Sequence, residues 1–251
     1  MCRPVTATIT NMFPYDPELL DAVQTPPQSV ADVIRIMLSI EATCSDLDGL
    51  KWFNRVYLQV TQAVANRIAS GGFADPAWLA ELDVQFARLY FGAVSAALSG
   101  QKAPECWQAL FDRRDNAATA RIQFALAGIN AHINHDLPQA IVTTCDTTST
   151  IPQHSGSQYA DYTALNSTLD SLIDSDKKTL NVRLPGDELP PVSHLEDTIA
   201  AFSVSAARES AWRNAELVWH IRALPPVYSS FLETLDGFTA VVGKTLLVPV
   251  P

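Results

Sequence analysis

The residues best suited to chemistry lie together in the segment RIQFALAGINAHINHDLP, residues 121–138. On a helix with about 100° per residue, His132, His135 and Asp136 share one face. A histidine beside a carboxylate has a defined tautomer and a raised pKa, so it can act as a base and then as an acid near neutral pH. These three residues are therefore the candidate catalytic group.

The cluster is open to three interpretations. In metal-free acid–base catalysis, His132 is the principal base or acid, Asp136 orients it, and His135 handles a second proton; no cofactor is then needed. In a metal-dependent hydrolase, the same three residues bind a divalent ion, and a further carboxylate completes the shell, drawn from Asp83, Asp161 and Glu216. In a non-catalytic binding or scaffold protein, the face is a structural hydrogen-bond network.

Gly128 lies on the same helix face, one turn before His132. A glycine in the middle of a helix costs about 1 kcal/mol relative to alanine. Its small size leaves room above the helix or lets another part of the chain come close. We therefore expect a cavity or close packing over His132.

Further polar and aromatic side chains could position a substrate beside this group. Asn54 and Tyr57 form a polar strip on an otherwise apolar helix, and Arg208 lies among tryptophans on another. The chain also offers many apolar and aromatic side chains, which suit a small, largely hydrophobic substrate; the tryptophans among them are Trp52, Trp107, Trp212 and Trp219. The candidate substrate-binding residues are Asn54, Tyr57, Arg121, Asn130, Asp161, Arg208 and Trp212.

Helices must hold these side chains, because long proline-free stretches with helical periodicity alternate with prolines. We expect an all-α single domain, a multi-helix bundle over residues 29–241, with an N-terminal extension (1–28) and a C-terminal tail (242–251). Two long polar segments, 143–157 and 181–193, are expected to be loops that serve as lids or binding segments. The expected helices are Ser29 to about Ala42, Asp46–Ala69, Pro76 to about Leu98, Pro104–Phe111, Ala117–Asp136, Asp161–Lys177, Leu195–Leu224 and Val227–Val241.

Composition limits the partners and the compartment. The 251 residues carry a formal net charge of −10, which disfavours nucleic acid and anionic membranes. The sequence shows neither a signal peptide nor an apolar stretch long enough to span a membrane. Its four cysteines, at 2, 44, 106 and 145, fit neither a zinc ribbon nor a disulfide framework. We expect a cytoplasmic protein with a small-molecule substrate and free buried thiols.

The segment Gly128–Pro138 resembles the signature of the uncharacterised DUF5995 family. Looser matches follow at Asp48–Tyr57, Phe73–Leu79, Asp161–Tyr162 with Asn166, and Arg208–Trp212 with Trp219. The resemblance covers about residues 45–225. It implies a shared site around the His/Asp motif and implies no particular reaction.

Overall fold

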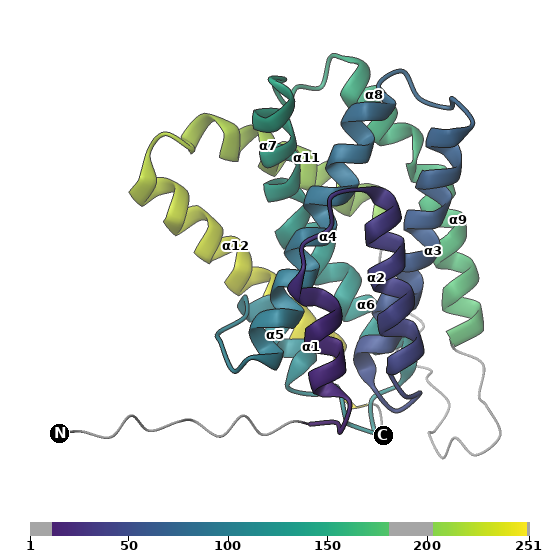
Figure 1. Cartoon of the computed structure of the whole chain (residues 1–251). Coiled ribbons are helices and arrows are strands. Elements are labelled where there is room, and N and C mark those ends of the chain that lie inside the picture. The colour runs from purple at the N-terminus through teal and green to yellow at the C-terminus, as the bar shows by residue number, and fades with distance from the viewer. Residues whose placement is uncertain (1–11, 181–202, 250–251) are drawn as a thin grey trace.

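The protein consists of α-helices packed around one central helical run (Figure 1). The computed structural model describes residues 12–180 and 203–249, and no strand occurs within them, which confirms the all-α class. The elements are α1 (Asp16–Gln24), α2 (Val30–Thr43), α3 (Gly49–Ala69), α4 (Pro76–Leu98), α5 (Glu105–Phe111), α6 (Arg121–Ala131), η1 (His132–Asp136), α7 (Leu137–Thr148), α8 (Ser157–Ala164), α9 (Asn166–Leu180), α11 (Val204–Ile221) and α12 (Pro225–Leu246).

Side-chain caps fix where the first long helices begin. The Ser29 side chain accepts a hydrogen bond from the backbone of α2, and Asp75 does the same for α4, which has Pro76 in its first turn. These two helix starts agree with the sequence-based expectation. Helix α3 begins at Gly49, because the Asp48 side chain caps it by accepting from a backbone N–H.

The central run consists of α6, η1 and α7, which follow one another without a break. In η1 the backbone N–H of Leu137 donates to the carbonyl of His132, five residues back, which is π-helical geometry. The helix expected to end near Pro138 therefore continues. The π-turn lies just before this proline, which has no backbone N–H to donate to the preceding turn.

The segment 143–157, expected to be a polar loop, is helical through Thr148, so that expectation was wrong. The hydroxyls of Thr143, Thr147 and Thr148 each donate to the carbonyl four residues earlier, which lets these threonines remain in the helix. The helix ends at Ser149, which has a left-handed backbone with φ of 55°. Only residues 149–156 form the connection to α8.

Other features also differ from the expectation, and the helix expected from Ala117 begins at Arg121. Two helices, α8 and α9, replace the single helix expected over Asp161–Lys177, and α1 lies within the N-terminal extension. Helix α12 continues past Val241 to Leu246, and Gln123 donates to the backbone carbonyls of Leu246 and Val248. The expected loop 181–193 and the first residues of the helix expected from Leu195 lie outside the described residues.

Paired glycines bring α3 and α6 into close contact. A Cβ on Gly128 would lie 2.3 Å from the Phe53 ring, and one on Gly49 would lie 2.4 Å from the Phe124 ring. In both helices the glycine and the phenylalanine are four residues apart, so each glycine receives the phenylalanine of the other helix and the two helices run parallel. Of the cavity or close packing expected over His132, the close packing at this helix face is supplied by Phe53, which contacts both Gly128 and the His132 ring.

The neighbours of the central run place η1 in the middle of the molecule. Helix α6 packs against α3 and α12, whereas α7 packs against α4 and α11. Figure 1 shows α12 running along one side of the bundle and α1 to α4 on the other. In the described part of the chain no helix is long and apolar enough to cross a membrane. Cys44, Cys106 and Cys145 are free and buried, as expected.

Candidate active site

Asp136 is the centre of the buried polar group in η1. Its Oδ2 lies 2.9 Å from Nδ1 of His132, and its Oδ1 lies 2.7 Å from Nδ1 of His135. The indole Nε1–H of Trp107, on α5, donates to Oδ2 at 2.9 Å. All four side chains are buried. The structure thus brings the three candidate catalytic residues together, and a tryptophan joins them.

Burial and hydrogen bonding shift the pKa values of Asp136, His132 and His135 in opposite directions. Burial alone would raise the pKa of Asp136, but the hydrogen bonds from His132 and His135 outweigh it and hold that pKa below its usual value. Burial lowers the pKa of His132 despite its bond to Asp136, so His132 is neutral at pH 7. Burial also tends to lower the pKa of His135, but the hydrogen bond to Asp136 and the negative charge of Asp136 outweigh burial and raise this pKa above its usual value.

The tautomer of His132 follows from these contacts. An ionised Asp136 only accepts hydrogen bonds, so Nδ1 of the neutral imidazole must carry the proton. The other ring nitrogen, Nε2, then bears a lone pair. This Nε2 is buried and has no hydrogen-bond partner.

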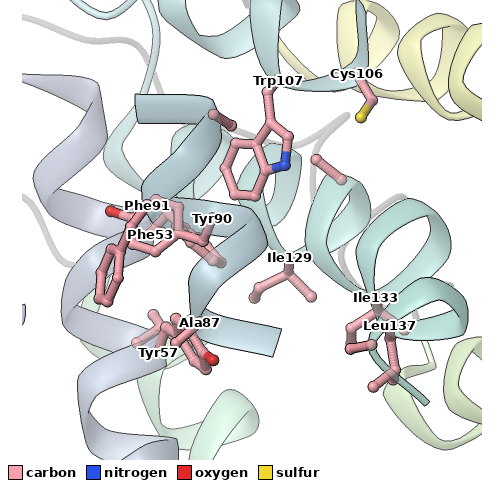
Figure 2. Packing of buried hydrophobic residues seen from close by; sticks show 14 of the residues in the cluster. Phe53, Tyr57, Ala87, Tyr90, Phe91, Cys106, Trp107, Ile129, Ile133 and Leu137 are labelled. Atoms are coloured by element: carbon pink, nitrogen blue, oxygen red, sulfur yellow. The ribbon is translucent and has the colours of Figure 1, made fainter. Parts of the chain in front are cut away.

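Aromatic rings hold the His132 imidazole in place. It stacks on Phe86 with 3.4 Å between ring centroids and an interplanar angle of 5°, and Tyr57 meets it edge-on at 4.4 Å. Phe53 and Trp107 also contact the His132 ring edge-on. Figure 2 shows Phe53 and Tyr57 entering from α3 and Trp107 from α5. A ring enclosed in this way has one defined orientation.

An apolar cavity of ≈ 50 Å³ adjoins His132. Its polar lining residues are Tyr57, His132 and Arg208, and the remaining lining comes from α3, α4, the central run, α9 and α11. The hydroxyl of Tyr57 is buried and, like Nε2 of His132, has no hydrogen-bond partner. The apolar lining residues are Phe53, Val56, Val60, Phe86, Ile129, Ile133, Leu169, Ile173 and Val204.

Two of the expected substrate-binding residues line this cavity. Burial raises the pKa of Tyr57 well above its usual value, so its hydroxyl stays protonated and can donate. Arg208 is buried and held in place, because its Nε donates to Asn166 and its Nη2 to the carbonyl of Tyr162, both at 2.8 Å. The Arg208 guanidinium also lies 3.9 Å from the centroid of the Tyr162 ring.

The other five expected residues are not among the cavity lining. Asn54 donates to the carbonyl of Met37 on α2, and Asn130 donates to the carbonyl of Thr239 on α12. Both carboxylate oxygens of Asp161 accept backbone N–H groups at the start of α4. The guanidinium of Arg121 lies over the Trp52 ring, and the Trp212 indole donates to Glu216. The Trp212 contact lies within α11, and the other four join different parts of the fold.

Among the described residues, none of the carboxylates considered as additional metal ligands joins His132 or His135 in a group close enough to share an ion. Asp83 is buried on α4, its Oδ2 has no hydrogen-bond partner, and burial raises its pKa to about 7. Glu216 accepts from His154 at 2.7 Å on the outer face of α11. Across the described residues, the group of ligand atoms close enough to share an ion contains His135 with Cys106 and Asp236.

Trp107, Cys106 and Asp236 escaped the sequence-based selection. Trp107 counted only as part of the aromatic supply and Cys106 only as a buried thiol. Their distance along the chain from residues 132–136 hides the contact, because packing of α5 and α12 against the central run creates it. Burial, with the charges of Asp136 and Asp236, raises the pKa of the Cys106 thiol, so the thiol is protonated at pH 7.

A family model described as a family of unknown function, DUF5995, matches residues 30–249. The chain belongs to the DUF5995 family. No curated protein and no solved structure matches it. The match extends beyond the expected range of 45–225 at both ends. In this DUF5995 chain the matched range contains the cavity, the η1 cluster and all of α12.

Proposed function

We propose that this DUF5995 protein is an acid–base enzyme that moves a proton on a small, largely apolar substrate, as in an isomerisation, elimination or cyclisation. The observation that carries the proposal is the unpartnered Nε2 of His132 beside the apolar cavity. An apolar pocket with a few polar groups and a residue of perturbed pKa is the usual form of a small-molecule site.

His132 is the base in this proposal. Its neutral ring offers the Nε2 lone pair, and Asp136 fixes the tautomer through Nδ1. When Nε2 takes a proton, the positive charge on the ring lies next to the Asp136 carboxylate, which stabilises it. The imidazolium can then return the proton at another atom of the same substrate.

Tyr57 and Arg208 stabilise the negative charge that develops on the substrate. Removal of a proton from carbon leaves negative charge on the substrate, and a preorganised donor in a site without water stabilises that charge. The unpartnered hydroxyl of Tyr57 is such a donor, and Arg208 contributes a buried positive charge to the same wall. His135 does not line the cavity, so its role here is to hold Asp136 from the other side.

The cavity volume limits the substrate. A water molecule needs about 10–15 Å³ of such space, so ≈ 50 Å³ accommodates a molecule of a few heavy atoms. Acetone is a suitable probe, because it is small, mostly apolar and weakly acidic at the carbons next to its carbonyl.

The experiment follows exchange of the acetone methyl protons for solvent deuterium by NMR. We expect saturable acceleration by the wild-type protein and a loss of about 100-fold or more in His132→Gln, because general acid–base catalysis contributes about 10²–10⁴-fold. His154→Gln is the matched control, since His154 is exposed and remote from the cavity lining. Equal acceleration by the wild type and His132→Gln, or none by the wild type, contradicts the proposal.

A second measurement tests the base without any substrate. Nitrogen NMR of histidine-labelled protein at neutral pH distinguishes the two tautomers. We expect the proton of His132 on Nδ1 and a bare Nε2. A proton on Nε2 would remove the base and favour a purely structural network.

A further inference from the structure

We propose a second site in this chain, a zinc-type metal site formed by Cys106, His135 and Asp236. One ligand atom from each residue lies within 4.8 Å of the others. The three side chains come from α5, η1 and α12, so the fold brings together residues that are 29 and 101 positions apart along the chain. This inference is independent of the proposed catalysis at His132.

The ligand types fit zinc. Zn²⁺ binds thiolate, imidazole and carboxylate at about 2.0–2.3 Å, and catalytic sites combine three protein ligands with one open position. Tetrahedral ligands at those distances lie about 3.3–3.8 Å apart. A group already within 4.8 Å therefore needs only small side-chain adjustments to close around an ion.

A second, independent observation is the orientation of His135. Its Nδ1 lies 2.7 Å from Oδ1 of Asp136, which leaves Nε2 as the nitrogen available to a ligand. Metal-binding histidines commonly donate their other N–H to a carboxylate in this manner, which fixes the tautomer and makes the ligating nitrogen more basic. The buried Asp136 thus serves as the positioning group of the proposed site.

Asp236 is held in place as well. Its two oxygens accept the backbone N–H groups of Glu105 and Cys106, each at 2.8 Å. Each carboxylate oxygen has two lone pairs, so both can keep these bonds while one coordinates an ion. Because Cys106 is one of the residues whose backbone binds Asp236, the thiolate and carboxylate ligands are fixed relative to each other. Figure 2 shows Cys106 next to Trp107 on α5.

The surroundings leave an approach to the site. Cys106 and His135 are buried, whereas Asp236 is partly exposed on α12. The amide nitrogen of Gln139 lies 3.3 Å from Nε2 of His135 and must move or turn when an ion binds. The thiol proton of Cys106 leaves on binding, because zinc takes the thiolate.

Titration of the chelator-treated full-length chain with Co²⁺ tests the proposal. We expect saturable binding of one ion per chain, a thiolate-to-cobalt charge-transfer band in the near ultraviolet, and displacement by Zn²⁺. Cys106→Ser should abolish the band and weaken Zn²⁺ binding 100-fold or more. Asp236→Asn should weaken it while the band persists, because the thiolate remains.

Matched controls separate this site from the rest of the molecule. Cys145→Ser removes another buried thiol, and His132→Gln removes the neighbouring histidine; both should bind Co²⁺ as the wild type does. Circular dichroism and the unfolding temperature report whether Cys106→Ser remains folded, and Cys106→Ala provides a second replacement, which is apolar. The proposal is overturned if the wild type does not bind Co²⁺ or if the bound ion shows no thiolate band. It is also overturned if Cys145→Ser loses as much metal affinity as Cys106→Ser. None of these results depends on proton exchange at His132.

Discussion

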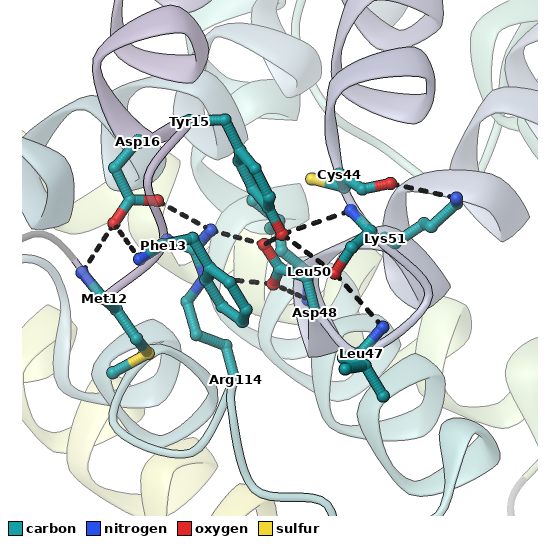
Figure 3. Close-up of polar contacts among 11 residues, drawn as sticks. Met12, Phe13, Tyr15, Asp16, Cys44, Leu47, Asp48, Leu50, Lys51 and Arg114 are labelled. Atoms are coloured by element: carbon teal, nitrogen blue, oxygen red, sulfur yellow. Dashed lines mark hydrogen bonds and ion pairs between the residues drawn. The ribbon is translucent and has the colours of Figure 1, made fainter.

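Two buried aspartates in this chain, Asp48 and Asp136, are satisfied in opposite ways. Asp48 forms an ion pair with the buried guanidinium of Arg114, whose Nε donates at 3.0 Å, and Arg114 also pairs with Asp16 (Figure 3). The backbone N–H of Leu50 and the hydroxyl of Tyr15 add further donors to Asp48. This cluster fastens α1, the start of α3 and the segment after α5 to one another.

Asp136, by contrast, has neutral or titratable donors. In the described part of the chain its partners are the two histidines and Trp107, and no lysine or arginine reaches it. An arginine keeps its proton throughout the accessible pH range, whereas a histidine can accept and release one. The Arg114 cluster can therefore only hold the fold together, whereas the Asp136 group can hold a proton in position and let it move.

Arg114→Met should have the largest effect on stability. It leaves the carboxylates of Asp16 and Asp48 buried without their positive partner, which costs about 3–5 kcal/mol. Urea unfolding of the variant measures the loss. Arg35→Met is the matched control, because Arg35 pairs with Asp32 at the surface and such pairs contribute about 0.2–1 kcal/mol. Similar losses in the two variants would show that the buried cluster is not needed to hold α1.

Asp136→Asn should cost less, about 1–3 kcal/mol, because its partners can adapt in part. The asparagine oxygen must face Trp107 and His132, since the indole can only donate. The amide NH₂ then faces His135, which must move its own proton from Nδ1 to Nε2 to accept. Nitrogen NMR should show an inverted tautomer at His135 and an unchanged one at His132.

The same variant separates the two proposed sites. A proton on Nε2 of His135 blocks the metal ligand, so Co²⁺ affinity should fall by about 10–100-fold or more. The Nδ1 proton of His132 remains, so part of the exchange activity should persist. Unchanged tautomers at both histidines would contradict this assignment of the hydrogen bonds.

Local signals in the sequence predicted much of this arrangement. Ser29 and Asp75 mark helix starts through backbone hydrogen bonds within three residues, and the His132–Asp136 contact follows from helical spacing. Trp107 could not be found in this way, because only the packing of α5 brings its indole to residue 136. The Thr143–Thr148 segment was misjudged because polar composition resembles a loop, although its hydroxyls bond within the helix.

His154 offers the smallest test, on a surface counterpart of the Asp136 group. Here one histidine joins two carboxylates, with Nδ1 2.7 Å from Glu216 and Nε2 3.2 Å from Glu209. Slight burial tends to lower the pKa of His154, but the hydrogen bonds to both glutamates outweigh it and raise this pKa above 6.5. The pKa of Glu209 lies below 4.5, because Tyr159 donates to it and His154 adds a further bond.

The signs of these shifts define a pH window. The raised pKa of His154 gives stability that is complete below pH 6.5 and is lost as the pH rises through the folded-state pKa. The lowered pKa of Glu209 gives stability that is present above pH 4.5 and is lost as the pH falls through the folded-state pKa. His154→Gln should therefore destabilise the protein most between these values, by about 0.2–1 kcal/mol. Urea unfolding at about pH 5.5 and about pH 8.5 measures the difference. A loss that is the same at both pH values would mean that the loop 149–156 is held by packing against Tyr159 and not by the ion pairs.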